Sequence, residues 1–305
     1  TIANYGTLLF NATAAKTISP AITDNGTTTV QVINSANSVA PGIITFSGNV
    51  AADTITIGNT TYAGSALFNG TVSGTNINIV GGDHASEASL GKFANTVSVT
   101  AITLDTNTGT ATAEFSGTGV TVTGTINGLA TTEGIVTASG TTTFASTIGA
   151  THRPAQLTVS GATTFQAAVQ TGALTTTAAI SNGTTLDVSG TSSIGGNITT
   201  TGTQTYTGAV TITGTAATRT LTNTSSAITF SSTVDSTALA ANSLTFGAGT
   251  GTATFTGAVG GASNGALGTI TNASGQTLIF SDAVSATTIA NYGTLLFNAA
   301  SAKTI

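Results

Sequence analysis

Three residues of one short segment have side chains that could bind a metal ion. Asp83, His84 and Glu87 lie within GGDHASEASLGK, so two carboxylates and an imidazole fall within one short stretch of chain. Carboxylate oxygens and imidazole nitrogens are ligands of Ca²⁺ and Zn²⁺. No second group of ligands is recognisable in the sequence, and a solvated loop accounts for the same residues. We therefore expect no metal site, with these three residues as the candidates if there is one.

Two further patterns could suit nucleophilic or acid–base chemistry. His152 and Arg153 precede Pro154, and Ser263 is the central residue of GASNG, which fits G-x-S-x-G. Proline cannot donate to a β-ladder, so we expect an exposed turn at His152. The G-x-S-x-G pattern has meaning only between a strand and a helix, and no helical periodicity surrounds Ser263. Neither pattern predicts a catalytic residue.

The acidic residues are spread along the whole chain. They are Asp24, Asp53, Asp83, Glu87, Asp105, Glu114, Glu133, Asp187, Asp235 and Asp282. Enzymes that cleave polysaccharides need several charged groups that converge on one face. Such even spacing suits solubility better than catalysis. We predict that the protein is not an enzyme and that it has no cofactor.

The composition excludes several other functions. Only 5% of the 305 residues are charged, and the formal net charge is −5 with five Lys plus Arg. A nucleic-acid-binding surface needs more positive charge than this. The chain has no Cys, so it has no disulfide, thiol nucleophile or thiolate metal site. Abundant β-branched residues and scarce charge argue against disorder. The longest uncharged window, residues 236–281, is rich in Thr, Ser, Asn and Gly and does not predict a membrane helix.

The two ends of the chain carry nearly the same sequence. Residues 1–18 (TIANYGTLLFNATAAKTI) and 288–305 (TIANYGTLLFNAASAKTI) are identical at 16 of 18 positions, with an offset of 288 − 1 = 287 positions. We interpret residues 1–287 as one unit of a long tandem repeat and residues 288–305 as the start of the next copy. The chain also has no Met, so we expect it to be a piece of a longer protein.

A shorter repeat is anchored on aromatic residues. An aromatic is followed at the fourth position by Val or Ile at Phe46/Val50, Phe68/Val72, Phe93/Val97, Phe144/Ile148, Phe165/Val169, Tyr206/Val210, Phe230/Val234, Phe255/Val259 and Phe280/Val284. The residue between them is usually small. Because residues i, i+2 and i+4 share one face of a strand, we expect a large–small–branched pattern on one strand face.

The aromatic spacing predicts a solenoid. When the imperfect copy at Phe115 is included, most of the spacings lie between 21 and 25, with a 29 before Phe144 and a 41 before Tyr206. Leu186–Val188 occupies the place of a missing copy within the 41. A period of ~24 residues suits three short strands per coil. We predict a right-handed parallel β-helix of about 12 coils, with Phe230, Phe255 and Phe280 in one column.

Another all-β architecture is compatible with the turn signals. Three tandem immunoglobulin-like sandwiches of ~95 residues would also show turn residues every 8–12 positions. Their aromatics would, however, recur once per sandwich rather than once per short coil. We therefore favour the β-solenoid and keep the tandem sandwiches as the alternative.

Several phrases resemble a known class of repetitive protein. GTQTYTGAVTITG, GTTTFASTIGA and LTVSGATTFQAAV resemble the Thr/Gly-rich β-strand repeats of large bacterial surface proteins, such as autotransporter passengers and filamentous-haemagglutinin-like adhesins. The resemblance implies export, a right-handed β-solenoid and a structural or adhesive role, and it assigns no functional residue.

These observations lead to one expected function. We expect a structural repeat segment of a giant extracellular protein on the cell surface that self-assembles into a fibre, appendage or surface layer. Its partner would be itself, through end-to-end and lateral contacts, with neither nucleic acid nor membrane insertion, and possible contact with a host or neighbouring cell. The alternative is an adhesin, or a solenoid that binds ice or a receptor through Thr-x-Thr segments such as Thr211–Thr215.

Overall fold

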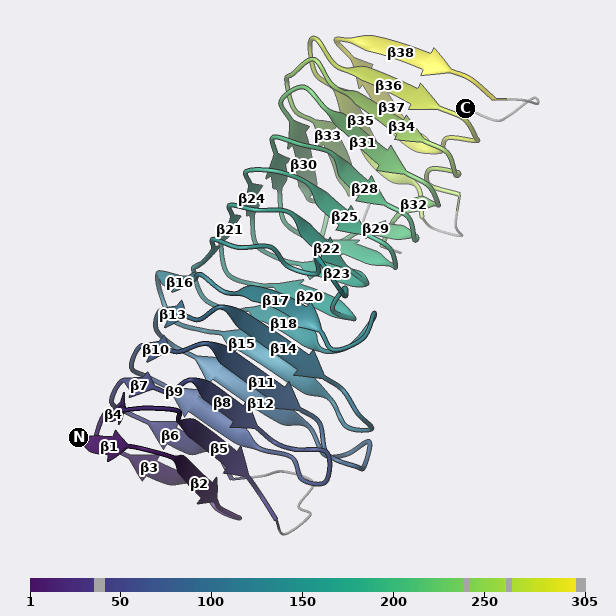
Figure 1. The fold of residues 1–305 in the computed structure, drawn as a ribbon. Coiled ribbons are helices and arrows are strands. Elements are labelled where there is room, and N and C mark those ends of the chain that lie inside the picture. Colours follow the sequence, from purple (N-terminus) through teal and green to yellow (C-terminus); the bar gives the residue numbers. More distant parts are fainter. Residues whose placement is uncertain (36–41, 238–241, 262–264, 300–305) are drawn as a thin grey trace. The chain divides into compact units, whose positions relative to one another are not determined.

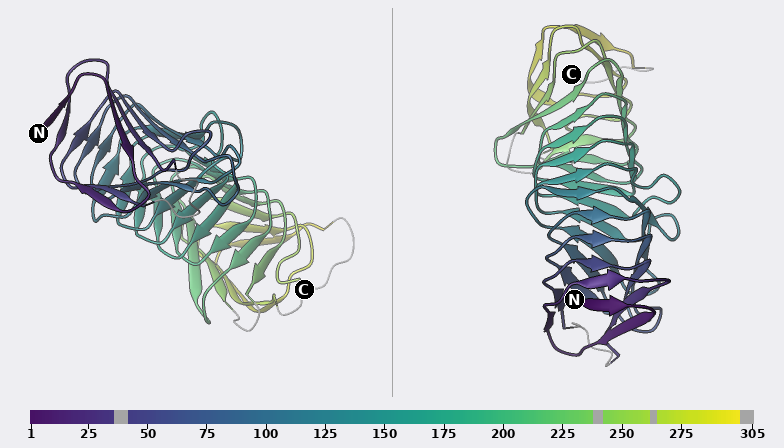
Figure 2. Two further views of the ribbon diagram at one scale, coloured as in Figure 1. Left: turned by 90° about the horizontal axis from the view of Figure 1, so that it is seen from below. Right: turned by 60° about the vertical axis from the view of Figure 1, so that its left-hand side comes forward.

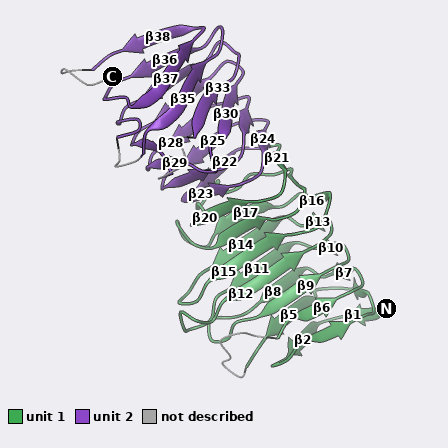
Figure 3. Ribbon diagram, turned by 180° about the vertical axis from the view of Figure 1, so that it is seen from behind, with its two compact units in different colours: residues 1–166 green, residues 167–305 purple. Residues whose placement is uncertain are grey.

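The computed structural model describes residues 1–35, 42–237, 242–261 and 265–299. Within these ranges every regular element is a β-strand, and neighbouring strands pair in parallel. In each part of the chain the strands stack as a right-handed β-solenoid, with about 13 turns in all, which confirms the predicted fold class. The chain divides into two compact units, residues 1–166 and 167–305 (Figure 3).

Unit 1 has three parallel sheets, which we name 1A, 1B and 1C in the order in which the chain visits them (Figure 1). Sheet 1A contains β1 (Ile2–Asn4), β4 (Ile22–Asp24), β7 (Val50–Ala51), β10 (Val72–Ser73), β13 (Val97–Ser98), β16 (Val120–Val122), β19 (Thr142–Phe144) and β21 (Thr163–Phe165). Sheet 1B contains β2 (Thr7–Asn11), β5 (Thr29–Ile33), β8 (Thr54–Ile57), β11 (Asn76–Val80), β14 (Ala101–Asp105) and β17 (Thr125–Gly128). Sheet 1C contains β3 (Lys16–Ile18), β6 (Ile44–Phe46), β9 (Ser65–Phe68), β12 (Ser89–Phe93), β15 (Ala111–Phe115), β18 (Ile135–Ala138) and β20 (Gln156–Val159).

Unit 2 repeats this arrangement with sheets 2A, 2B and 2C. Sheet 2A contains β24 (Ile180–Asn182), β27 (Ile198–Thr200), β30 (Thr218–Asn223), β33 (Ser243–Phe246), β35 (Leu267–Asn272) and β37 (Ala286–Asn291). Sheet 2B contains β22 (Val169–Thr171), β25 (Leu186–Val188), β28 (Gln204–Tyr206), β31 (Ala227–Phe230), β34 (Thr252–Phe255), β36 (Thr277–Phe280) and β38 (Thr294–Phe297). Sheet 2C contains β23 (Ala173–Thr176), β26 (Ser192–Ile194), β29 (Val210–Ile212) and β32 (Val234–Ser236).

The core of each unit consists of columns of like side chains. In sheet 1B an aliphatic column runs through Val30, Ile55, Ile77, Ile102 and Ile126, all fully buried. The alternate residues, on the solvent side of these strands, are mostly Thr, Asn, Ala and Gln. Thr and Val favour extended backbone because they are stiff at χ1. Each coil therefore buries one face while its backbone groups bond to the coils on either side.

The aromatic residues also form columns. Phe46, Phe68, Phe93 and Phe115 stack in sheet 1C with ring centroids 5.0, 5.2 and 5.4 Å apart. In sheet 2B the column runs through Tyr206, Phe230, Phe255, Phe280 and Phe297. The predicted column of Phe230, Phe255 and Phe280 is confirmed, and so is the coil at Leu186–Val188, because Val188 pairs with Tyr206.

The predicted large–small–branched pattern on one strand face is wrong. Phe46 ends β6 in sheet 1C, whereas Val50 begins β7 in sheet 1A, so the residues between them form a tight turn. The small residue lies at the corner, where the backbones of successive coils come close together. A Cβ on Gly70 would come within 2.5 Å of the backbone of Gly48 in the preceding coil. The motif therefore marks a corner of the solenoid rather than a strand.

The turn after the aromatic residue occurs at different corners of the solenoid along the chain. In unit 1 it joins sheet 1C to 1A from Phe46 to Phe93, but Phe144 ends a strand of sheet 1A. In unit 2 the turn after Tyr206, Phe230 and Phe255 leaves sheet 2B. The wider spacing between Phe115 and Phe144 thus records a change of sheet rather than one long coil.

Coil length also varies more than the sequence period predicts. The step from Ile22 to its partner Val50 covers 50 − 22 = 28 positions, whereas the step from Ile180 to its partner Ile198 covers 198 − 180 = 18. The difference lies in the connections, since the paired strands keep similar lengths.

Candidate functional site

The longer connections of unit 1 bring three of its acidic side chains and one of its histidines to one edge. They join sheet 1B to 1C and comprise residues 58–64, 81–88, 106–110 and 129–134. Loops extend sideways from the stacked coils in the right-hand view of Figure 2. We call this group the 1B–1C edge. Asp83, His84, Glu87 and Glu133 lie there, so the even sequence spacing of the acids conceals a partial clustering. In the sequence, only the coil period could have indicated that these residues lie at one edge.

Asn107 ties three of these connections together. Its Nδ2 donates to the carbonyl oxygens of Thr60, at 2.9 Å, and Gly82, at 3.2 Å. Its backbone N–H donates to Oδ1 of Asp105 at 3.0 Å, and its φ of 44° lies in the left-handed region that Asn tolerates. The edge is therefore held by one amide that reaches two other coils.

The metal candidates do not converge. Asp83 and His84 are exposed, whereas Glu87 is only 3% exposed and its Oε2 has no hydrogen-bond partner. Glu87 turns inward, with its side chain against Gly82. Across the described residues, no three His, Asp or Glu side chains are grouped so as to hold a metal ion. The structure thus separates the three residues that the sequence places together.

The other two sequence patterns have different outcomes. His152 and Arg153 lie in a loop, as predicted, but they are half-buried rather than exposed. Their carbonyl oxygens accept from the backbone N–H groups of Gly128, at 3.1 Å, and Thr132, at 2.8 Å. These contacts give the segment a structural role in bonding adjacent connections. Ser263 lies outside the described residues.

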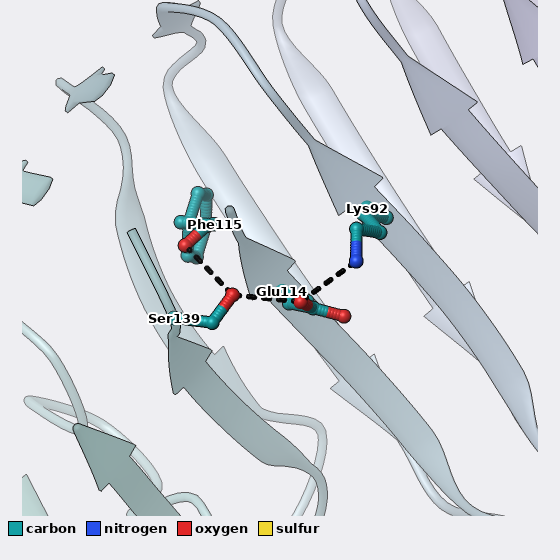
Figure 4. Close-up of polar contacts among 4 residues, drawn as sticks. All are labelled: Lys92, Glu114, Phe115 and Ser139. Carbon is teal, nitrogen blue, oxygen red and sulfur yellow. Dashed lines mark hydrogen bonds and ion pairs between the residues drawn. The ribbon is translucent and has the colours of Figure 1, made fainter. Parts of the chain in front are cut away.

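A polar network on the outer face of sheet 1C joins three successive coils (Figure 4). Nζ of Lys92 in β12 lies 2.9 Å from Oε1 of Glu114 in β15, and Oγ of Ser139, just after β18, donates to the same oxygen at 2.7 Å. The Lys92 and Glu114 side chains are 35% and 20% exposed. The carboxylate accepts from both neighbours, so the network bonds one coil to the next.

A second polar network is buried in unit 2. The hydroxyl of Tyr206 donates to Oε1 of Gln204 at 3.0 Å, and Nε2 of Gln204 donates to Oγ1 of Thr200 and the carbonyl of Thr222. Burial raises the pKa of the Tyr206 phenol above its ordinary value, because the charged form would lose its solvation. The phenol therefore serves as a neutral donor within the core.

The first and last described coils have the same local structure. In the first, Oδ1 of Asn4 accepts from the N–H of Gly6 at 3.1 Å, and in the last, Oδ1 of Asn291 accepts from Gly293 at 3.3 Å. β1 and β2 of the first coil correspond to the end of β37 and to β38 at the offset of the long repeat. The near-identical sequences thus fold alike over the described part of the second copy, which ends at residue 299.

Asparagine side chains link each terminal coil to its neighbour. Nδ2 of Asn272 donates to Oδ1 of Asn291 at 2.7 Å and to the carbonyl of Thr294 at 2.9 Å. Nδ2 of Asn4 donates to the carbonyl of Thr29, in the coil that follows, at 3.3 Å. Sequence reasoning missed these contacts, and the only available signal was an Asn just before a turn in both copies.

The comparisons with known proteins add no further assignment. No protein-family model, curated protein or solved structure matches the sequence. A search of the described residues for a helix with the length and hydropathy of a membrane span gave none.

Proposed function

We propose that this chain is a structural repeat segment of a giant extracellular β-solenoid protein that self-assembles into a surface fibre, appendage or surface layer. The observation that carries the proposal is the equivalence of the two terminal coils, which repeat both the sequence and the strands of residues 1–11 at the offset of the long repeat. A sequence that returns to its first coil after a whole number of turns can continue the same stack without a change of structure.

The surface chemistry supports lateral association. Outward-facing columns of small polar residues, such as Ser181, Thr199 and Thr222 in sheet 2A, carry no charge. With 5% charged residues overall, neighbouring rods repel one another weakly. The resemblance to repetitive bacterial surface proteins points to the same location and role.

Electron microscopy and light scattering of the purified chain test the assembly. We expect filaments or sheets whose size grows with protein concentration, because open ladders at both ends favour pairing with further strands. Monodisperse single particles at millimolar concentration would contradict the proposal. Antibodies against the chain should label intact cells of the source if the surface location is right, and should label only broken cells if it is wrong.

The second candidate is an adhesin or receptor-binding solenoid, favoured by the 1B–1C edge. Asp83, His84 and the 56%-exposed Leu129 lie on connections of that edge. If the edge binds a receptor, replacement of these three residues by Ala would abolish attachment to cells and leave assembly unchanged. The same replacements would leave both unchanged if the chain is purely structural.

A further inference from the structure

The last described coil is paired on one side only. Within the described residues β37 and β38 end their sheets, with β35 and β36 on their paired sides. Phe297 stacks on Phe280 with a centroid distance of 5.7 Å, yet 45% of it remains exposed. The unpaired side therefore presents backbone donors and acceptors together with an aromatic ring.

The first coil shows what covers this side. β1 pairs with β4, with Ile2 opposite Ile22, and β2 pairs with β5, with Thr7 opposite Thr29 and Phe10 opposite Val32. The same strand sequences recur at residues 289–297 with the same asparagine–glycine contact. A surface that fits residues 2–11 on this side therefore also fits residues 289–297.

We propose that residues 22–33 of a second copy of this chain bind the open side of residues 289–297 in the register in which they bind residues 2–11. Ile289 then pairs with Ile22, Thr294 with Thr29, and Phe297 with Val32. Asn291 donates to the carbonyl of Thr29 of the second copy, as Asn4 does within the chain. This inference rests on the proposed self-assembly and adds the partner surface and its register.

Two copies of one coil then compete for one site. In a single chain, residues 2–11 already pair with residues 22–33, and they have the advantage of an effective concentration in the millimolar range. The coil 288–297 of another chain succeeds only where the first coil is weakened or absent. Residues 2–11 therefore compete with joining between separate chains in this register.

Cross-linking of single cysteines tests the register, since the native chain has no Cys. One chain carries Thr294→Cys, and its partner carries Thr29→Cys together with Ile2→Asp and Phe10→Asp, which weaken the first coil. Thr29 lies on the solvent side of its strand, between buried neighbours Thr28 and Val30. With a short thiol-specific cross-linker, we expect at least tenfold more mixed dimer than with Thr29→Cys in a chain whose first coil is intact.

Matched variants exclude other contacts. Thr23→Cys in the same weakened chain should give no mixed dimer, because Thr23 pairs with Ala3 and would face Ala290 rather than Thr294. Thr7→Cys in a chain with an intact first coil reports simple stacking of one end coil on another. Amide exchange of β31 and β34 should match that of the native chain, because the substituted coil contacts only its neighbour.

Each outcome decides the proposal. A Thr294–Thr29 adduct that depends on weakening of the first coil supports it. Three results would overturn it. They are an adduct only between Thr294 and Thr7, a Thr294–Thr29 adduct whose yield is the same with an intact first coil, and no adduct at all. Filaments observed without the Thr294–Thr29 adduct would support self-assembly and contradict the proposed register. The proposed function and this inference can therefore fail separately.

Discussion

The rings of Phe230 and Phe255 stack with their centroids 4.7 Å apart and their planes within 11° of parallel. The two residues are 255 − 230 = 25 positions apart and are direct partners in β31 and β34. Phe280 continues the stack at 4.8 Å from Phe255. One turn of the chain therefore places each ring directly on the previous one, and this column is an apolar contact between the coils of sheet 2B.

Phe255→Ala should strongly destabilise unit 2. Phe255 is fully buried between two rings, so its removal loses both stacks and leaves a cavity, at a cost of about 3–5 kcal/mol. Guanidinium unfolding followed by amide exchange of β31, β34 and β36 measures the loss. Thr254→Ala on the solvent side of the same strand is the control and should change stability by less than about 0.5 kcal/mol. Equal effects for the two variants would contradict the column.

Part of this arrangement could be predicted from sequence. The constant spacing of Phe230, Phe255 and Phe280 is sufficient to predict their column, because residues separated by one coil length occupy the same position in successive coils. The turn between Phe46 and Val50 could not be predicted, because alternate positions look the same whether the chain continues straight or turns a corner. What distinguishes the two is the approach of Gly70 to Gly48, which only the stacked coils reveal.

Gly70→Ala should destabilise unit 1, whereas Gly6→Ala should not. A Cβ on Gly70 meets the backbone of Gly48, which cannot move without breaking the next corner, and we expect a cost of about 1–3 kcal/mol. A Cβ on Gly6 has no atom within 4 Å. Thermal unfolding of the two variants side by side gives the comparison. A Gly70→Ala protein as stable as Gly6→Ala would show that the corners have room to relax.

Tyr206→Phe should weaken unit 2 without opening a cavity. The change removes the hydrogen bond to Oε1 of Gln204 and leaves that buried acceptor unpaired, which costs about 1–3 kcal/mol. The ring stack on Phe230, at 5.2 Å, is retained. The double variant Tyr206→Phe with Gln204→Leu tests whether the unpaired acceptor causes the loss. Removal of both partners should then lower the free energy of unfolding by less than the sum of the two single changes. Additive losses would show that the two residues act independently.

The candidate sites were less predictable than the fold. Asp83, His84 and Glu87 are neighbours in sequence, but the strands on either side fix their connection so that Glu87 points into the protein and the other two point out. Lys92, Glu114 and Ser139 are far apart in sequence and meet because each lies one coil from the next. Such contacts depend on the exact length of each coil, and the sequence period gives only an average of those lengths.

Glu114→Gln should have a small, salt-dependent effect. The Lys92–Glu114 pair is partly exposed, so its contribution should be about 0.2–1 kcal/mol and should decline as salt screens it. A double-mutant cycle with Lys92→Met at low and high salt measures the coupling. Ser139→Ala serves as a neutral comparison, since the loss of its hydrogen bond should not vary with salt. A coupling energy that stays constant with salt would mean that the network is not electrostatic in origin.

Asn272→Leu should loosen the last coil alone. Nδ2 of Asn272 donates to the carbonyls of Gln276 and Thr294 and to Oδ1 of Asn291, and the leucine leaves these acceptors unpaired. Because a solenoid coil contacts only its neighbours, the loss of about 1–3 kcal/mol should fall on β37 and β38. Amide exchange should therefore accelerate at Tyr292 and Thr294 and stay unchanged in β31. Asn298→Ala is the control. Exchange that accelerates throughout unit 2 would show that its coils unfold together, and the last coil would then not open independently of the others.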